Sequence, residues 1–145
     1  MRLQHRVDEY RIIVPGPAIS FRSPQARDYK RLVRDKAHTV FKAPLCCDLI
    51  EARLDYFHIR RRRVDMDNIA KCILDALNGV AYADDRQVKL QSATDYSLQE
   101  PVFIYGGPVD LVKPLADYDE YLFIRIRGLS KREKPKDPTW QPNIT

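Results

Sequence analysis

Apolar and polar residues recur along the chain with two different periods, and these periods predict its secondary structure. A period of two, or a short apolar run between turn residues, favours a strand, whereas apolar residues three or four positions apart favour a helix. The pattern predicts four strands and two helices. In chain order they are a strand at 10–14, a helix from Ser23 to 41, a strand at 45–59, a helix at 67–78, and strands at 87–94 and 120–127.

The first predicted helix has a clear start and two different faces. Ser23 followed by Pro24 is typical of an N-cap and the first helical position. The basic residues of this segment fall largely outside its apolar stripe, so we expect the helix to bury one face and to expose a basic one. The apolar stripe consists of Tyr29, Leu32, Val33, Ala37, Val40 and Phe41.

The order of the elements predicts an α+β domain with a mixed β-sheet and two main helices. Residues 98–118 contain three prolines and a Gly-Gly pair, which predict a long loop. Residues 130–145 are rich in proline and lysine and predict a flexible tail, so the domain itself spans residues 1–129. In the last strand the face expected to be buried is aliphatic, formed by Leu122, Ile124 and Ile126.

Length and composition limit the class of protein. The chain has 145 residues, of which 44% are hydrophobic and 31% charged, as expected for one globular domain. No apolar run approaches the roughly 20 residues that span a bilayer, so we expect no membrane contact. The polar first nine residues lack the apolar core of a signal peptide, which favours a cytoplasmic location. The three cysteines show no zinc-binding spacing and are interpreted as buried small residues.

Charge is distributed unevenly along the chain. The net charge is +5, with seven basic residues between Ser20 and Lys42, whereas residues 95–120 contain six acidic residues and one lysine. A basic surface of this kind favours a polyanionic partner, most simply nucleic acid, although basic patches also occur on proteins that bind none. The residues predicted to contact DNA are Arg22, Arg27, Lys30, Arg31, Arg34, Arg60, Arg61, Arg62 and Arg63.

The stretch RRRRVDMDNIAK, at 60–71, sets four arginines beside two aspartates. Asp65 and Asp67 share a face only if the chain stays extended up to Asp67, which we therefore expect to cap the following helix. On that helix Lys71 lies about 40° and Asp75 about 80° from Asp67, so the three form one polar edge. The alternative is a solvated helix face on which an i, i+4 Asp–Lys–Asp series adds little stability.

A second acidic pair follows the helix. After Gly79 the segment VAYADD is expected to return the chain towards the helix start and to present Asp84 and Asp85 there. Clustered carboxylates repel one another unless a cation neutralises them, and Mg²⁺ prefers such oxygen ligands. A metal site flanked by arginines predicts chemistry on a phosphodiester: the arginines hold the polyanion and the aspartates hold the metal.

The stretch RRRRVDMDNIAKCILDALNGVAYADDRQV resembles the signature of the RusA-type Holliday-junction resolvases, also called crossover junction endodeoxyribonucleases. The dense match runs from Arg60 to Val88, and VPGPAISFR more loosely resembles the family's Gly/Pro-rich turn. The resemblance implies a two-fold dimer that cuts four-way DNA junctions by paired phosphodiester hydrolysis in recombination and repair.

The same resemblance assigns roles to individual residues. It implies that Asp65, Asp67 and Asp85 bind one or two Mg²⁺ ions per subunit, with Mn²⁺ able to substitute, and that Lys71 is catalytic. Supporting roles are predicted for Asn68 and Asp75, which could orient Lys71 and the helix start or could simply be exposed, and for Asp84, the neighbour of Asp85.

Two departures from the family pattern concern the DNA contacts. The stretch QSATDY, at 91–96, has no lysine where family members often carry one, and the last two strands are separated by a longer insertion. The alternative functions are a catalytically altered relative that binds branched DNA and a nuclease that cuts flaps or forks. The three histidines are isolated in sequence, so surface or core positions are expected for them rather than a metal site.

Overall fold

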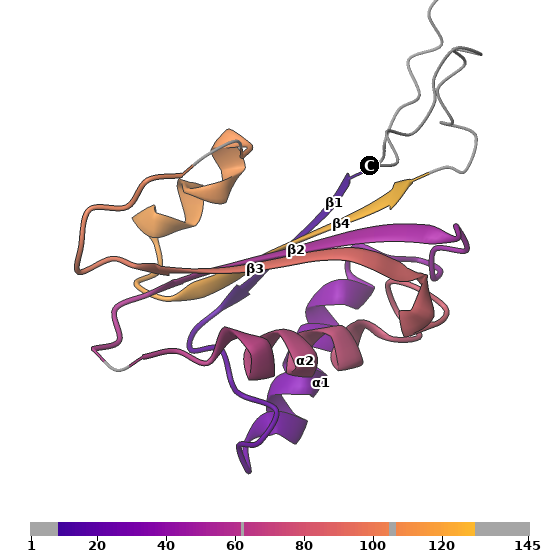
Figure 1. Ribbon diagram of the computed structural model, residues 1–145, viewed down its shortest axis with the longest axis horizontal. Coiled ribbons are helices and arrows are strands. Elements are labelled where there is room, and N and C mark those ends of the chain that lie inside the picture. The colour runs from indigo at the N-terminus through magenta and orange to yellow at the C-terminus, as the bar shows by residue number, and fades with distance from the viewer. Residues whose placement is uncertain (1–8, 62, 105–106, 130–145) are drawn as a thin grey trace, which may run out of the picture.

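The computed structural model describes residues 9–61, 63–104 and 107–129. This part of the chain contains two α-helices and four strands, and three short 3-10 helices lie between them (Figure 1). The main elements are β1 (Glu9–Pro15), α1 (Ala26–His38), β2 (Leu49–His58), α2 (Met66–Leu77), β3 (Val88–Ser97) and β4 (Tyr121–Leu129). The 3-10 helices are η1 (Asp85–Gln87), η2 (Val109–Leu111) and η3 (Lys113–Ala116).

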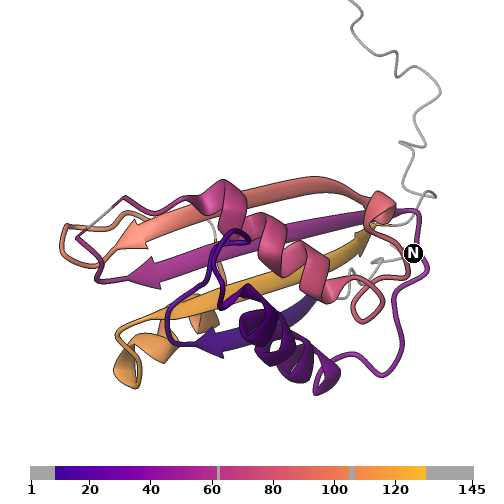
Figure 2. The same cartoon turned by 90° about the horizontal axis from the view of Figure 1, so that it is seen from below.

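The four strands form one mixed sheet in the order β1-β4-β2-β3. β2 and β3 are parallel, whereas β4 runs antiparallel to both β1 and β2. Both α-helices cover the same face of this sheet, with α1 on the β1 side and α2 along β2 and β3 (Figures 1 and 2). The predicted α+β fold with a mixed sheet and two main helices is confirmed. None of the described helices is long and apolar enough to cross a membrane.

Both predicted helix starts are displaced by a few residues. Ser23 does not cap α1: it forms a turn in which its carbonyl accepts a hydrogen bond from the Ala26 amide (3.1 Å), and Gln25 is the N-cap. α2 begins at Met66, so the prediction that Asp67 caps it was wrong. Asp65 is the N-cap because its carboxylate accepts the Asn68 amide.

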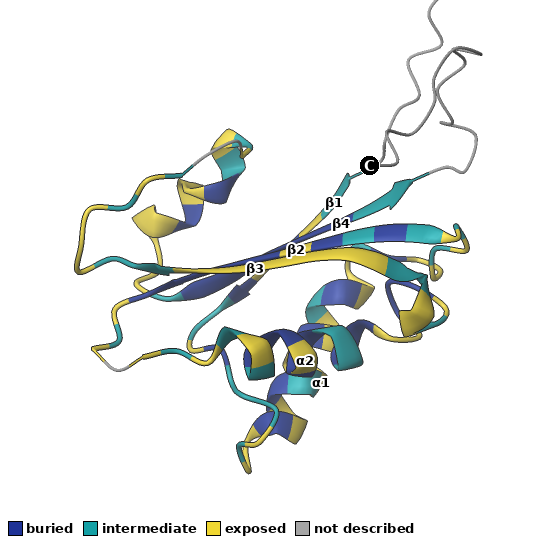
Figure 3. Ribbon diagram, viewed as in Figure 1, coloured by how far each residue is buried: buried dark blue, intermediate teal, exposed yellow. Residues whose placement is uncertain are grey.

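Apolar side chains are buried on both faces of the sheet (Figure 3). The larger core lies between the sheet and the two α-helices. The smaller one lies on the opposite face, where Leu111 from the 98–118 segment packs near Phe57, Tyr121 and Phe123. The expectation that only the aliphatic face of the last strand is buried was therefore wrong, because the long segment folds back over the other face and buries all of 121–126.

A buried ion pair lies within this second face of the sheet. Arg125 of β4 donates from Nη2 to Oδ2 of Asp55 on β2 at 2.9 Å, and each side chain is only 8% exposed. Removing two charges from water costs free energy, and only the attraction between the charges offsets that cost. Loss of one partner therefore leaves an uncompensated buried charge.

Replacing one partner of this pair should destabilise the fold strongly. We expect Arg125→Met to lower the free energy of unfolding by about 3–5 kcal/mol, because Asp55 is left buried without its cation. The double variant Asp55→Leu/Arg125→Met should recover most of the loss. Urea denaturation of the wild type and the two variants measures both effects, and an Arg125→Met variant as stable as the wild type would show that solvent reaches the pair.

Candidate active site

The connection between the two parallel strands forms the candidate site. β2 and β3 are parallel, so the chain must cross back between them, and α2 is that crossover. Ligands commonly bind where the carboxyl ends of parallel strands meet the following helix. Here two adjoining hollows that share Asp67 and Ala93 form a groove along α2 and β3, the α2–β3 groove.

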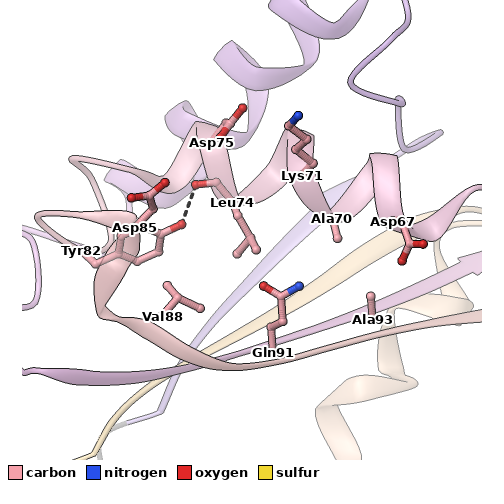
Figure 4. A pocket seen from close by; sticks show the side chains of 10 residues that line it. All are labelled: Asp67, Ala70, Lys71, Leu74, Asp75, Tyr82, Asp85, Val88, Gln91 and Ala93. Atoms are coloured by element: carbon pink, nitrogen blue, oxygen red, sulfur yellow. Dashed lines mark hydrogen bonds between the residues drawn. The ribbon is translucent and has the colours of Figure 1, made fainter.

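One end of the groove lies at the N-terminus of α2 and the other near its C-terminus (Figure 4). The N-terminal end is lined by Arg63, Val64, Asp65, Met66, Asp67, Ala93, Thr94 and Asp95. The remainder is lined by Asp67, Ala70, Lys71, Leu74, Asp75, Tyr82, Asp85, Val88, Gln91 and Ala93. The predicted residues Asp65, Asp67, Lys71 and Asp85 all line this groove.

Asp65 is held at the helix start by Asn68. Its carboxylate accepts the Asn68 backbone amide at 3.2 Å and the Asn68 side-chain amide at 2.6 Å. These two hydrogen bonds, the backbone one first, lower the pKa of Asp65, and the nearby charge of Arg22 lowers it further. Asp65 is therefore an oriented, ionised carboxylate. The side chain of Asn68 supports it directly.

Asp67 lies in the first turn of α2 and points towards β3, where Ala93 faces it across the groove (Figure 4). Both Asp65 and Asp67 line the N-terminal end of the groove. The extended conformation that we expected up to Asp67 is thus not required: Asp65 precedes the helix, Asp67 belongs to it, and the two still face one hollow.

Asp85 lies at the other end of the groove, near Asp75 and Tyr82 (Figure 4). Burial raises the pKa of Tyr82, and the negative charges of Asp85 and Asp75 raise it further, so both carboxylates are close to this hydroxyl. Asp75 is eight residues beyond Asp67, which corresponds to about 12 Å along a helix. Within one chain, Asp85 is therefore too distant to share an ion with Asp67.

The segment after α2 explains this separation. Gly79 has a positive φ of +83°, and its amide donates to the Tyr82 carbonyl at 2.8 Å, which closes a tight turn directly after the helix. Tyr82 in turn donates from its hydroxyl to the Leu74 carbonyl at 2.5 Å. The expectation that VAYADD returns to the helix start was wrong, because these contacts hold it at the helix end.

The two adjacent aspartates face different hollows. Asp84 caps η1 by accepting the Arg86 amide at 2.9 Å and pairs with the Arg86 guanidinium, also at 2.9 Å. These contacts, the guanidinium first, hold the pKa of Asp84 well below its usual range. Asp84 lines a shallow hollow with Asp48 and Lys89 rather than the groove. Of the pair, only Asp85 lines the α2–β3 groove.

Lys71 is held by an aromatic ring that sequence analysis did not single out. Its ammonium lies 4.3 Å from the ring centroid of Phe21, and the ammonium of Lys30 lies 4.8 Å from the same centroid. The Phe21 amide donates to the Asn68 carbonyl at 3.0 Å, which fixes this loop against α2. Asp75, predicted to orient Lys71, instead pairs with Lys30 at 3.6 Å. The sequence signal that could have identified Phe21 is its position beside the Gly/Pro-rich turn.

The predicted DNA-binding residues divide into two groups. Arg60 donates to the Ala18 carbonyl at 3.0 Å and lies 3.8 Å from Glu120, and Arg34 donates to the Ala76 carbonyl at 3.0 Å. These two arginines therefore have partners within the protein. Arg62 lies outside the described residues. Arg34 is nevertheless exposed, as are the remaining arginines of the set, Arg22, Arg27, Arg31, Arg61 and Arg63.

The donors at the N-terminal end of the groove suit a hard divalent cation. Asp65 and Asp67 are exposed, so ionised carboxylates cost little there, and oxygen ligands of this kind bind Mg²⁺. Within the described ranges, however, no three Asp, Glu, His or Cys side chains converge closely enough to form a complete metal site. The described chain therefore supplies part of a coordination sphere, not all of it.

Comparison with known proteins identifies a family to which the chain is related. Residues 16–104 match the family described as Endodeoxyribonuclease RusA, which is more than half of the chain and includes β2, α2, β3 and the whole groove. No curated protein matches the chain. The carboxylates and Lys71 along the groove thus lie within the matched span. The chain belongs to the RusA endodeoxyribonuclease family.

Proposed function

We propose that this protein is a Mg²⁺-dependent, structure-selective endodeoxyribonuclease that resolves four-way DNA junctions by paired nicks. The observation that carries the proposal is the α2–β3 groove, in which Asp65, Asp67 and Lys71 line an open surface inside the matched span. The exposed Arg63 lines the end of the groove that holds the two aspartates, and the charge of the exposed Arg22 also acts on Asp65. A phosphodiester needs both features, cations to hold it and carboxylates to hold the metal.

Each side chain has a defined task in this proposal. Asp65 and Asp67 hold the cation at the start of α2, and Asn68 keeps Asp65 in position through its two hydrogen bonds. A bound Mg²⁺ or Mn²⁺ supplies a water of lowered pKa and stabilises the charge that grows on the phosphate. Lys71 leaves the Phe21 ring to contact the scissile phosphate, because an ammonium on an aromatic face is only weakly held.

The third carboxylate of the family motif, Asp85, fits this scheme through a dimer. β3 is an edge strand that pairs only with β2 among the described strands, and residues 89–95 are exposed. Two-fold pairing of β3 with its copy would set the strands antiparallel, so that the start of one lies beside the end of the other. Asp85 of the second copy then reaches the end of the groove that Asp65 and Asp67 occupy.

The carboxylates should be required for cutting but not for DNA binding. We expect Asp65→Asn, Asp67→Asn and Asp85→Asn each to reduce nicking of a labelled four-way junction by more than about 100-fold, since even groups that support a metal ligand cost 10–100-fold. Binding measured without metal should stay close to wild type. Asparagine is also a good N-cap, so the melting temperature of Asp65→Asn should change little. Its loss of nicking can then be attributed to the lost negative charge.

Asp117→Asn is the matched control, because it removes one exposed negative charge in the 98–118 segment, away from the groove. It should nick at the wild-type rate, and Lys71→Ala should bind the junction but cut slowly. The same assay should compare the four-way junction with flap, fork and plain duplex DNA substrates. Normal cutting by Asp67→Asn would contradict the metal assignment, and preference for flaps would contradict junction resolution.

The arginines should separate into DNA-binding and structural groups. If Arg61 and Arg63 contact phosphates, the double variant Arg61→Gln/Arg63→Gln should flatten the dependence of log affinity on log salt by about 0.9 per lost contact. Arg60→Gln should leave that slope unchanged and lower the melting temperature, because Arg60 contacts Ala18 and Glu120. Fluorescence anisotropy at about 50–300 mM salt measures this slope for the wild type, the double variant and Arg60→Gln. Equal slopes for the wild type and the double variant would remove both residues from the interface.

Mixing two inactive variants tests the shared site. Asp67→Asn and Asp85→Asn homodimers should each be inactive, whereas a mixed dimer should regain nicking, because one of its two sites then combines a normal Asp67 with a normal Asp85 from the other chain. Sedimentation should give about twice the 16.9 kDa chain mass. If mixed dimers form by mass but stay inactive, Asp85 acts within its own chain or not at all.

A further inference from the structure

Lys71 lies between two carboxylates that can neutralise it. Asp67 is four residues before it on α2 and Asp75 is four residues after it, and side chains at this spacing are neighbours on a helix. An acidic residue four positions ahead of a lysine is also the more favourable order for an ion pair, because it agrees with the helix dipole. Spacing alone therefore favours a Lys71 that is paired with Asp67 or Asp75.

The structure shows a different arrangement. Lys71 forms no ion pair with any residue that the structure describes, and its side chain and that of Asp67 point in different directions (Figure 4). The Lys71 ammonium lies 4.3 Å from the centroid of the Phe21 ring. Asp75 pairs instead with Lys30 of α1, at 3.6 Å. The charges of Lys71 and Asp67 thus stay apart, although the two residues are one helical turn from each other.

The Phe21 ring is held in place by the fold rather than by the lysines. The ring packs against the larger core, and its backbone amide donates to the Asn68 carbonyl at 3.0 Å. Three residues earlier, the Ala18 amide donates to the Tyr56 hydroxyl at 3.2 Å, and the Ala18 carbonyl accepts from Arg60 at 3.0 Å. The loop before α1 is therefore tied to both α2 and β2, and it presents a fixed aromatic face to the ammonium.

An aromatic ring holds a lysine without cancelling its charge. An exposed ion pair between residues four apart on a helix is weak, and a cation on an aromatic face is of comparable strength, so Phe21 can compete with Asp67 for Lys71. The ring carries no net charge, whereas a carboxylate would neutralise the ammonium. Lys30 adds to this effect because it occupies Asp75, and its own ammonium lies 4.8 Å from the same ring centroid.

We propose that Phe21 and Lys30 are positioning residues that keep Lys71 out of ion pairs with Asp67 and Asp75. Phe21 offers Lys71 an uncharged partner, and Lys30 occupies Asp75. The inference rests on the proposed function, in which Asp67 holds the cation and Lys71 contacts the scissile phosphate, and it explains how both charges stay available. Contact with DNA was the role predicted for Lys30, and none was predicted for Phe21.

NMR of the lysine ε-methylene groups, in the full chain without DNA or metal, tests the contact directly. The ring current of Phe21 should shift the ε-methylene protons of Lys71 upfield of those of the exposed Lys89. Phe21→Leu should remove this shift because leucine has no ring, and Phe21→Tyr should keep it. The signal missing from Lys71→Ala provides the assignment. Equal positions of the Lys71 and Lys89 signals in the wild type would overturn the inference.

Nicking rates show whether Phe21 acts through Lys71. With saturating junction and Mg²⁺, Phe21→Leu should lower the single-turnover rate by about 10-fold, since misplacement of a catalytic group can cost up to about 100-fold. Phe21→Tyr should restore most of the rate, and Phe21→Leu should have no further effect in Lys71→Ala protein. Phe103→Leu makes the same change at an exposed ring outside the groove and should match the wild type. A merely structural role of Phe21 would instead slow nicking equally with and without Lys71.

The role of Lys30 is tested by removing its partner as well. Lys30→Gln frees Asp75 to pair with Lys71, so the upfield shift and the rate at saturating junction should both fall. Lys30→Gln/Asp75→Asn leaves no carboxylate at that position, and both quantities should return close to the wild type. A double variant as slow as Lys30→Gln would overturn the role of Lys30. These variants keep the ring, so with the wild-type spectrum they decide the inference even if Phe21→Leu does not fold.

The outcomes separate this inference from the proposed function. If the wild type nicks junctions, an unchanged rate in Phe21→Leu, or an equal loss in the Lys71→Ala background, would overturn the inference and leave the proposed function intact. Absence of nicking by the wild type would overturn the proposed function and, with it, the role of both positioning residues. A loss in Phe21→Leu that depends on Lys71 supports both.

Discussion

Parallel pairing of β2 and β3 is the constraint on which the candidate site depends. Two parallel strands cannot be joined by a tight turn, so the chain crosses back through α2, which packs along them (Figure 2). The carboxyl end of β2 leads into the start of the helix, and the carboxyl end of β3 arrives beside it. Asp65 and Asp67 from one segment and Asp95 from another therefore line the same hollow, although 28 residues separate Asp67 from Asp95.

The arginines that precede α2 divide into one that is bound within the fold and others that are exposed. Arg60 is bound to Ala18 and Glu120, which ties the start of the arginine run to the fold, and Tyr56 donates to the same glutamate at 3.0 Å. Arg61 and Arg63 are exposed and remain available to phosphates. The adjacent carboxylates are stabilised by hydrogen bonds from Asn68 and by the N-terminus of α2. The stretch thus joins an arginine bound within the fold (Arg60), exposed arginines (Arg61 and Arg63) and an oriented carboxylate (Asp65).

Sequence patterns predicted the secondary structure, which depends on local periodicity. They failed for residue positions that contacts between distant segments determine. The strands, both helices and the polar edge of α2 follow from apolar spacing, and the family resemblance located the groove residues. The positions of Asp85, fixed by the Gly79 turn, and of the buried Tyr121, covered by residues 98–118, depend on tertiary contacts. The contact between Nε2 of His58 and Oδ1 of Asp95, 3.2 Å apart, depends on the register of β2 against β3, which spacing alone does not specify.

The central claim is that the divalent cation binds at the end of the groove formed by the start of α2 and the end of β3. Anomalous diffraction from Mn²⁺-soaked crystals of the DNA-free protein locates the ion directly. The account predicts a peak within about 2–2.5 Å of carboxylate oxygens of Asp65 or Asp67, since oxygen ligands bind divalent cations at such distances. A peak between Asp75 and Asp85 of the same chain, with none at Asp67, would contradict it.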